Sequence, residues 1–153
     1  TVRAAAYLDE KPTPDLSAKP LNHKPFWHVE RARIPNTRKV AVELVVNGYP
    51  VAKQEIVADG QIHDLEFDVP LEHSSWVAVR ILGTSHTNPV FVLLDGTPIR
   101  ASRRSADWCL KGVEQCWKEK EKFIAAKELD DAKAAYEHAR VEYRRIRKES
   151  VAD

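Results

Sequence analysis

The sequence has 153 residues, with 24 basic residues, 23 acidic residues and a formal net charge of +1. Apolar residues make up 43% of the chain and charged residues 31%, which is typical of a globular domain and not of a disordered chain. The balanced charge argues against nucleic acid or an anionic lipid surface as a general partner, because both need a surface of one sign. No apolar run approaches the roughly 20 residues needed to cross a bilayer, so we expect no membrane insertion.

The sequence contains no methionine, even at its first position, and its start lacks the apolar core of a signal peptide. We therefore expect a piece of a longer protein, with a processed product or a trimmed chain as the alternatives. The length suits one domain, or one domain with a short appendage.

The first region, residues 1–25, is expected to be an extended, proline-rich segment with an edge strand over residues 1–8. Four prolines exclude a helix or a central strand from the rest of it: Pro12, Pro14, Pro20 and Pro25.

Residues 26–101 have the pattern of a β-sandwich. Short runs rich in β-branched residues alternate with the turn pairs Asn47-Gly48, Asp59-Gly60 and Asp95-Gly96. After the β-leaning residues 26–34, the expected strands are residues 39–46, 49–57, 61–69, 75–82 and 88–94. The last is nearly continuously apolar, as in a core strand, and Trp76 lies where sandwiches often bury an aromatic side chain. The pattern predicts an antiparallel, immunoglobulin-like sandwich.

Residues 102–153 predict an antiparallel helical hairpin packed on or beside the sandwich, so the fold class is α+β. Ser102 or Ser105 is the expected N-cap. Two apolar stripes follow helical spacing, and their phase changes at residues 125–127, where we expect the turn. One continuous bent helix is the alternative, because no glycine or proline enforces a break there. The first stripe contains Ala106, Cys109, Leu110, Val113, Cys116, Trp117, Phe123 and Ile124.

The two cysteines are interpreted as buried thiols on this helix. Cys109 and Cys116 would lie roughly 10 Å apart at ~1.5 Å rise per residue, which is too far for a disulfide. They leave the redox compartment open.

No complete catalytic or metal site is visible in the sequence. The six histidines form neither H-x-H nor H-E-x-x-H, and His63-Asp64 would point to opposite faces of a strand. A nucleophile elbow, a phosphate-binding glycine loop and C-x-x-C are also missing. We therefore expect no catalytic residue, no metal ligand and no cofactor in this chain.

Three local features are candidates for an interface. Trp27 and His28 lie in a proline-bounded segment, and a tryptophan there suits a contact surface. The polar loop 83–89, with Ser85, His86 and Asn88, joins two core strands and could face a neighbour; alternatively, Thr87 and Asn88 satisfy turn backbone groups.

The third candidate is the run Arg100, Arg103 and Arg104 at a helix start. It could bind an anion with the free N–H groups there. The favoured interpretation is that these arginines pair with carboxylates of an adjoining domain or face solvent.

Several strings together resemble the C-terminal region of CehA/McbA-type metallohydrolases, of the polymerase-and-histidinol-phosphatase (PHP) superfamily. The resemblance runs from about Phe26 to Ile146 and is most specific over residues 75–117. Residues 87–91, Thr-Asn-Pro-Val-Phe, match the S/T-N-P-I/V-aromatic strand that closes an immunoglobulin-like domain in many PHP proteins. The strings are KPFWHVERARI, VELVVNGYPVA, SSWVAVRILGTSHTNPVFVLLDG, PIRASRRSADWCLKGVEQCW and AAYEHARVEYRRI.

The resemblance implies a parent protein that hydrolyses phosphoesters or related bonds with divalent metal bound in an upstream barrel. None of the family's ligand motifs is in this chain, so no catalytic residue is carried over. Relatives with export signals imply a periplasmic or secreted location by analogy.

Three functions follow as hypotheses. The leading one is a non-catalytic accessory domain of a PHP-type hydrolase, bracing the upstream catalytic domain or mediating assembly with a partner subunit or a second copy. The alternative is a free-standing sandwich that binds a protein or a glycan. The third is a small enzyme with a site around His86 and the nearby arginines.

Overall fold

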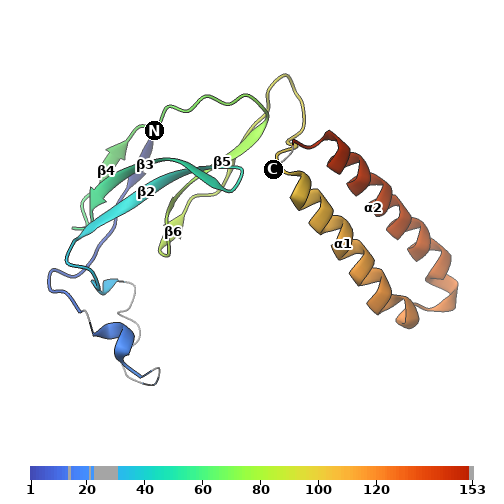
Figure 1. Cartoon of the computed structure of the whole chain (residues 1–153), viewed down its shortest axis with the longest axis horizontal. Coiled ribbons are helices and arrows are strands. Elements are labelled where there is room, and N and C mark those ends of the chain that lie inside the picture. Colours follow the sequence, from blue (N-terminus) through green and yellow to red (C-terminus); the bar gives the residue numbers. More distant parts are fainter. Residues whose placement is uncertain (14, 21, 23–30, 152–153) are drawn as a thin grey trace. The chain divides into compact units, whose positions relative to one another are not determined.

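The computed structural model describes residues 1–13, 15–20, 22 and 31–151. The chain is α+β, with antiparallel strands followed by two helices (Figure 1). It divides into two compact units: residues 1–72 with 76–92, and residues 73–75 with 93–153. Within the described residues, no helix has both the length and the apolar composition of a membrane span.

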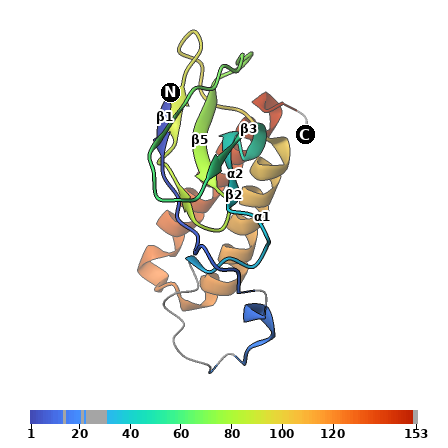
Figure 2. The same cartoon turned by 90° about the vertical axis from the view of Figure 1, so that its left-hand side faces the viewer.

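The first unit contains a five-stranded sheet in which the strand order is β3-β2-β5-β6, with β7 also paired to β5. Figure 2 shows β2, β3 and β5 of this sheet from a second side. Its strands are β2 (Lys39–Val46), β3 (Tyr49–Val57), β5 (Ser75–Ile81), β6 (Ser85–His86) and β7 (Val90–Val92). A second sheet pairs β1 (Val2–Ala4) antiparallel with β4 (His63–Leu65).

The β2–β3 hairpin forms as the sequence predicts, with the same bounds for both strands. Its two-residue turn places Asn47 at φ 51° and Gly48 at φ 97°, and this pair of positive angles is what a type I′ turn requires. The turn also contacts β5, because the Asn47 side chain accepts a hydrogen bond of 3.0 Å from the backbone N–H of Trp76. A register shift between Leu44 and Val45 leaves Val51 as an extra residue on β3, which is a bulge in that strand.

The core of this unit lies between the two sheets. Val42, Ile56 and Ile81 of the large sheet pack with Leu65 of β4, and all four side chains are buried. These residues lie on one face of their strands because side chains alternate between the two faces of a sheet. Half-buried neighbours extend the cluster: Val2, Ala4, Ala6, Val40, Phe67 and Val79.

Two predicted strands are much shorter than expected. The predicted strand over residues 1–8 forms only as Val2–Ala4, and the one over residues 61–69 only as His63–Leu65. The strands β1 and β4 pair with each other over three residues, and the ladder between them has no further residue pairs. Beyond it, the backbone of Leu8 donates to Ala58, and the chain continues with the short 3₁₀ turn Leu16–Ala18.

The prediction of a core strand over residues 88–94 is wrong. The strand β7 covers only residues 90–92, and Val90 and Phe91 are 64% and 66% exposed. A continuous apolar run indicates a strand that is covered on both faces. In the described part of the chain, neither side chain receives that cover.

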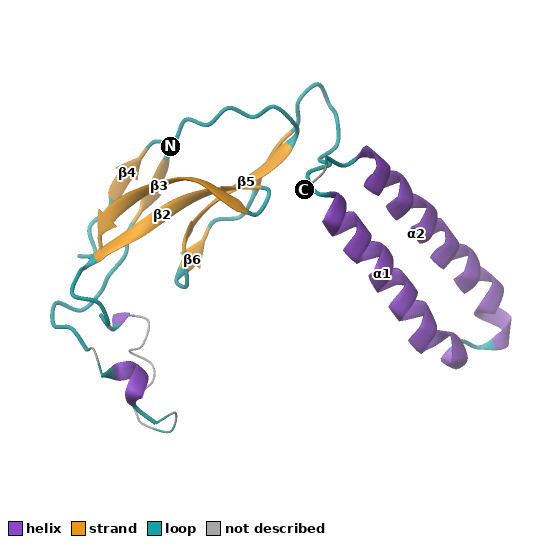
Figure 3. Ribbon diagram, viewed as in Figure 1, coloured by secondary structure: helices purple, strands orange, loops and turns teal. Residues whose placement is uncertain are grey.

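The second unit is a helical hairpin, as predicted, and not one bent helix (Figure 3). Helix α1 (Arg103–Lys120) and helix α2 (Leu129–Glu149) are antiparallel, and short 3₁₀ turns join them. The break lies at Ile124 and Ala125, whose backbones are extended. Ser102 caps α1, since its side chain accepts a 2.9 Å hydrogen bond from the N–H of Ser105.

The seam between the helices is centred on two aromatic rings. Trp117 and Tyr136 have ring centroids 4.9 Å apart, and the Arg140 guanidinium lies 5.9 Å from the Trp117 ring. Cys116 and Phe123 were expected in this stripe but are exposed. Helix α1 ends at Lys120 and the next residues wind as a 3₁₀ turn, which moves Phe123 out of phase with the stripe.

Candidate interaction site

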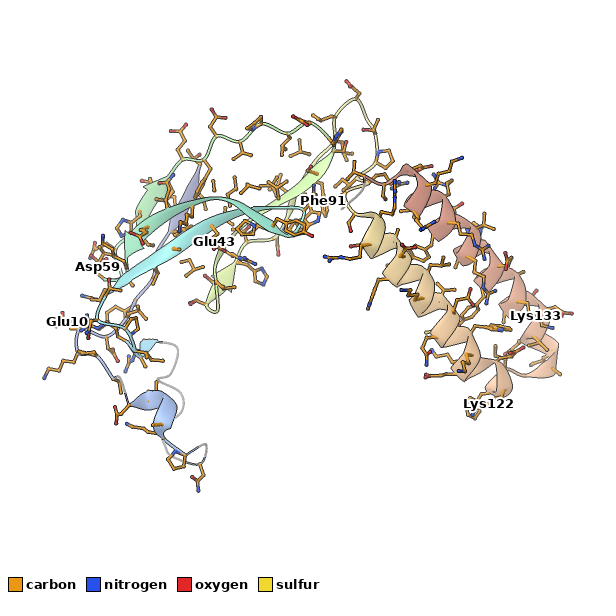
Figure 4. The ribbon with its side chains drawn as sticks, viewed as in Figure 1. Glu10, Glu43, Asp59, Phe91, Lys122 and Lys133 are labelled. Carbon is orange, nitrogen blue, oxygen red and sulfur yellow. The ribbon has the colours of Figure 1, made fainter. Side chains whose placement is uncertain are left out.

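A hollow of about 450 Å³ lies on the face of the large sheet that points away from the core. Its walls are mostly apolar, and the two largest side chains in it are Trp76 from β5 and Phe91 from β7. Figure 4 labels Phe91. We call this hollow the outer groove. Its lining residues are Val45, Gly48, Trp76, Ala78, Arg80, His86, Thr87, Pro89 and Phe91.

The position of Trp76 in the outer groove follows from the local structure. Trp76, Ala78 and Arg80 alternate along β5 and therefore share one face of the sheet. The backbone of Trp76 is bound on both sides by Asn47, whose N–H donates to its carbonyl and whose side chain accepts from its N–H. The hairpin turn thus holds the tryptophan at the groove wall.

The two ionisable side chains that line the outer groove, Arg80 and His86, both have polar partners within this chain. The Nε of Arg80 donates a 2.7 Å hydrogen bond to Oε2 of Glu43 on the neighbouring strand. The Nδ1 of His86 lies 3.0 Å from the carbonyl oxygen of Thr87. A carbonyl oxygen only accepts, so this nitrogen is the donor of the contact.

A second hollow, of about 350 Å³, lies on the opposite face, toward the core. We call it the inner groove. Val90 and Val92 reach into it, whereas Phe91 between them lines the outer groove. The same alternation places Val77 and Val79 of β5 in the inner groove. The strand β7 therefore stands between two open apolar hollows, one on each face of the sheet.

The predicted interface loop 83–89 is only partly a free loop. Ser85 and His86 form β6, which pairs with Ile81 and Arg80 of β5. Thr87 satisfies backbone groups, as the alternative interpretation holds: its hydroxyl accepts from the N–H of Val79 at 3.1 Å, and its own N–H donates to the Val79 carbonyl. His86 lines the outer groove and Asn88 the inner groove, while Ser85 lines a smaller hollow.

The predicted arginine run lies in the other unit and closes the helical hairpin. The Nε of Arg100 donates to Glu149 at 2.8 Å, and Arg103 Nη2 donates to the Ser150 carbonyl at 3.3 Å. The partners of these two arginines therefore include groups of this chain itself, at the end of α2. Arg104 is exposed in the first turn of α1.

The other predicted interface residues, Trp27 and His28, lie outside the described residues. Sequence reasoning missed Trp76 and Phe91, both of which it assigned to the core. The available signal was the apolar run of residues 88–94. Such a run indicates a strand that is covered on both faces, and this one follows a polar loop directly.

The described residues contain no group of three or more histidine, cysteine, aspartate or glutamate side chains that could hold a metal ion. Both cysteines are free thiols, with Cys109 half-buried and Cys116 exposed.

Comparisons with protein-family models, with curated proteins and with solved structures give no match for this chain.

Proposed function

We propose that this chain is a non-catalytic accessory region of a larger PHP-type metal-dependent hydrolase. In this proposal the first unit is an immunoglobulin-like sandwich that packs against another part of the parent protein. The strand β7 and its two grooves form the contact.

The observation that carries the proposal is the exposure of β7. Val90 and Phe91 point to opposite faces of the sheet, and each is more than 60% exposed. Isolated exposed apolar residues are common, but neighbours on both faces of one strand, each beside an apolar hollow, indicate a contact surface.

The resemblance to CehA/McbA-type proteins supports the same proposal. The exposed strand is part of the Thr87–Phe91 match to the family's closing strand. The parent's divalent metal would be held by its upstream barrel, and catalysis would take place there. A periplasmic or secreted location is proposed on the same analogy.

The proposal is tested on the natural polypeptide that contains this sequence, isolated with an antibody against the helical hairpin. We expect an intact mass well above the 17.4 kDa of this chain and a phosphoesterase activity that a metal chelator abolishes. A mature polypeptide of 17.4 kDa, or a larger one without hydrolase activity, contradicts the proposal.

A matched pair of variants tests the contact itself. Phe91→Asp places a charge in the outer groove, whereas Val51→Asp places one on β3, where Val51 is also exposed, at 48%. A buried unpaired carboxylate is costly, so we expect Phe91→Asp alone to lower the unfolding temperature of the natural polypeptide. Equal effects of the two variants would contradict contact at Phe91.

A second candidate function is glycan binding. Trp76 and Phe91 line one groove with Arg80 and His86 at its end, and an aromatic wall with planar polar groups suits a sugar ring. Titration of the natural polypeptide with a panel of soluble oligosaccharides tests this candidate. Quenching of tryptophan fluorescence that Trp76→Ala abolishes would support it, and silence across the panel would exclude those sugars.

A further inference from the structure

Beyond the proposed function, we propose that Ser74 is a latch that sets how far the helical hairpin can reach from the sheet. With the latch closed, the turn at residues 94–97 is bound to the start of β5, and the link from the turn to α1 is short. With the latch open, residues 93–99 become one longer link. The hydrogen bonds of a single buried hydroxyl group distinguish the two states.

The hydroxyl of Ser74 binds both ends of the turn. Ser74 directly precedes the first residue of β5 and is only 5% exposed. Its Oγ accepts a 2.9 Å hydrogen bond from the N–H of Leu94. The same oxygen donates to the Thr97 carbonyl at 2.7 Å and lies 3.0 Å from Thr97 Oγ1. Replacing this one side chain therefore removes all of these bonds together.

Little else binds the turn to another part of the chain. Its own hydrogen bonds run from the N–H and the hydroxyl of Thr97 to the Leu94 carbonyl, at 2.9 and 2.7 Å. They close the turn on itself, with Asp95 and Gly96 at positive φ and exposed to solvent. Among the described residues, the hydrogen bonds that join the turn to a distant segment all go to Ser74. A segment with so few outside contacts can open locally without global unfolding.

The far end of the link is bound to the hairpin. The Arg100 carbonyl accepts a 3.0 Å hydrogen bond from the N–H of Val151, which follows α2. With the latch closed, only Pro98 and Ile99 separate Arg100 from the turn. Extended chain spans at most about 3.3–3.6 Å per residue, so this link reaches roughly 7 Å. Residues 93–99, released together, reach roughly 24 Å.

The division of the chain into two units agrees with the latch. His73–Ser75 group with residues 93–153, whereas β5 from Trp76 onward belongs to the first unit. The boundary therefore crosses β5 between Ser75 and Trp76. The Ser74 hydroxyl binds these first residues to the turn, so its bonds determine whether residues 93–97 stay at the start of β5.

Hydrogen–deuterium exchange of the complete chain with Ser74→Ala is the first test. The Leu94 amide loses its acceptor, so we expect the amides of residues 93–97 to exchange at least roughly tenfold faster. Ser85→Ala is the matched control, because Ser85 is an exposed serine on β6, and it should change nothing. Unchanged exchange of residues 93–97 in Ser74→Ala overturns the latch. Faster exchange of β2 as well also overturns it, since Ser74 would then support the whole sheet.

Distances between two spin labels test the reach itself. One label is attached to Cys116 on α1 and the other to Val51→Cys on β3, with Cys109 replaced by serine. Both native positions are exposed. We expect a narrow distance distribution with Ser74 intact and in the Ser85→Ala control. Ser74→Ala should broaden it at least roughly twofold, because the link lengthens from roughly 7 to roughly 24 Å. Equal widths with and without the Ser74 hydroxyl overturn the proposal.

Discussion

Arg140 of helix α2 binds both carboxylate oxygens of Glu114 on helix α1, with Nε–Oε1 at 2.9 Å and Nη2–Oε2 at 3.1 Å. The same guanidinium lies over the ring of Trp117. One side chain thus joins the two helices by a bidentate ion pair and by contact with the aromatic seam. A lysine has the same charge but lacks the planar fork that this geometry uses.

We therefore predict that Arg140→Lys lowers the thermal unfolding midpoint of the hairpin, followed by the helical circular dichroism signal. Arg144→Lys is the control, since Arg144 makes a single 3.5 Å contact with Glu137 within its own helix. The control should leave the midpoint nearly unchanged. Equal shifts for the two variants would show that the bidentate pair has no special role.

The hairpin should lose stability in acid. Hydrogen bonds from Arg140, Arg145 and Arg100 lower the pKa values of three carboxyl groups, those of Glu114, Glu142 and Glu149, below the ordinary 4.5. A carboxyl group whose pKa is lowered in the folded state contributes its full stabilisation of the fold at pH values above the pKa that it has in the unfolded chain. That stabilisation is lost as pH falls through the folded value.

We therefore expect a flat unfolding midpoint above about pH 5 and a decline below it. The decline should be smaller when all three glutamates are replaced by glutamine, because the titrating groups are then gone. An unchanged acid slope in the triple variant would contradict this origin of the pH dependence.

The end of α2 is bound to the start of α1, and we predict that residues 150–151 are needed for that closure. The N–H of Val151 donates to the Arg100 carbonyl, and the N–H of Arg103 donates to the Val151 carbonyl. The second bond satisfies one of the free N–H groups at the start of α1. A chain that ends at Glu149 loses these two bonds and also three that Ser150 makes, two to the Ile146 carbonyl and one from Arg103. We expect it to be less stable by at least about 1–3 kcal/mol.

Denaturant unfolding measures this difference, and a chain that ends at Val151 is the control. The control keeps both backbone bonds and should match the complete chain. If the chain ending at Glu149 is equally stable, the closure contributes nothing.

The core between the two sheets should be sensitive to a single truncation. Ile56 is only 3% exposed and packs with three other buried side chains. Ile56→Ala removes apolar contacts and leaves a cavity, so we expect a loss of about 2–5 kcal/mol in the free energy of unfolding. Val51→Ala, on the same strand but exposed, should change it by less than about 0.5 kcal/mol.

The sequence predicts the β2–β3 hairpin and the helical hairpin well because their signals are local. The alternation of Val40, Val42 and Leu44 and the Asn47-Gly48 turn are contained in one short segment. The change of stripe phase near Ala125 is similarly local, and the break occurs there.

The sequence does not predict which groups meet across long separations. Arg103 and Ser150 are 47 positions apart, and no local sequence pattern around either residue predicts the hydrogen bond between them. The exposure of Phe91 was missed for a different reason. A continuous apolar run indicates a strand that is buried on both faces, but it does not indicate which residues bury it.

The most direct test of the central claim is the accessibility of position 91 in the natural polypeptide. Phe91→Cys and Val51→Cys are each made with Cys109 and Cys116 replaced by serine, and their labelling by a maleimide is timed. Phe91 is the more exposed of the two side chains in this chain alone, at 66% against 48%. We predict rapid labelling at position 51 and strong protection at position 91, and equal labelling rates would contradict the account.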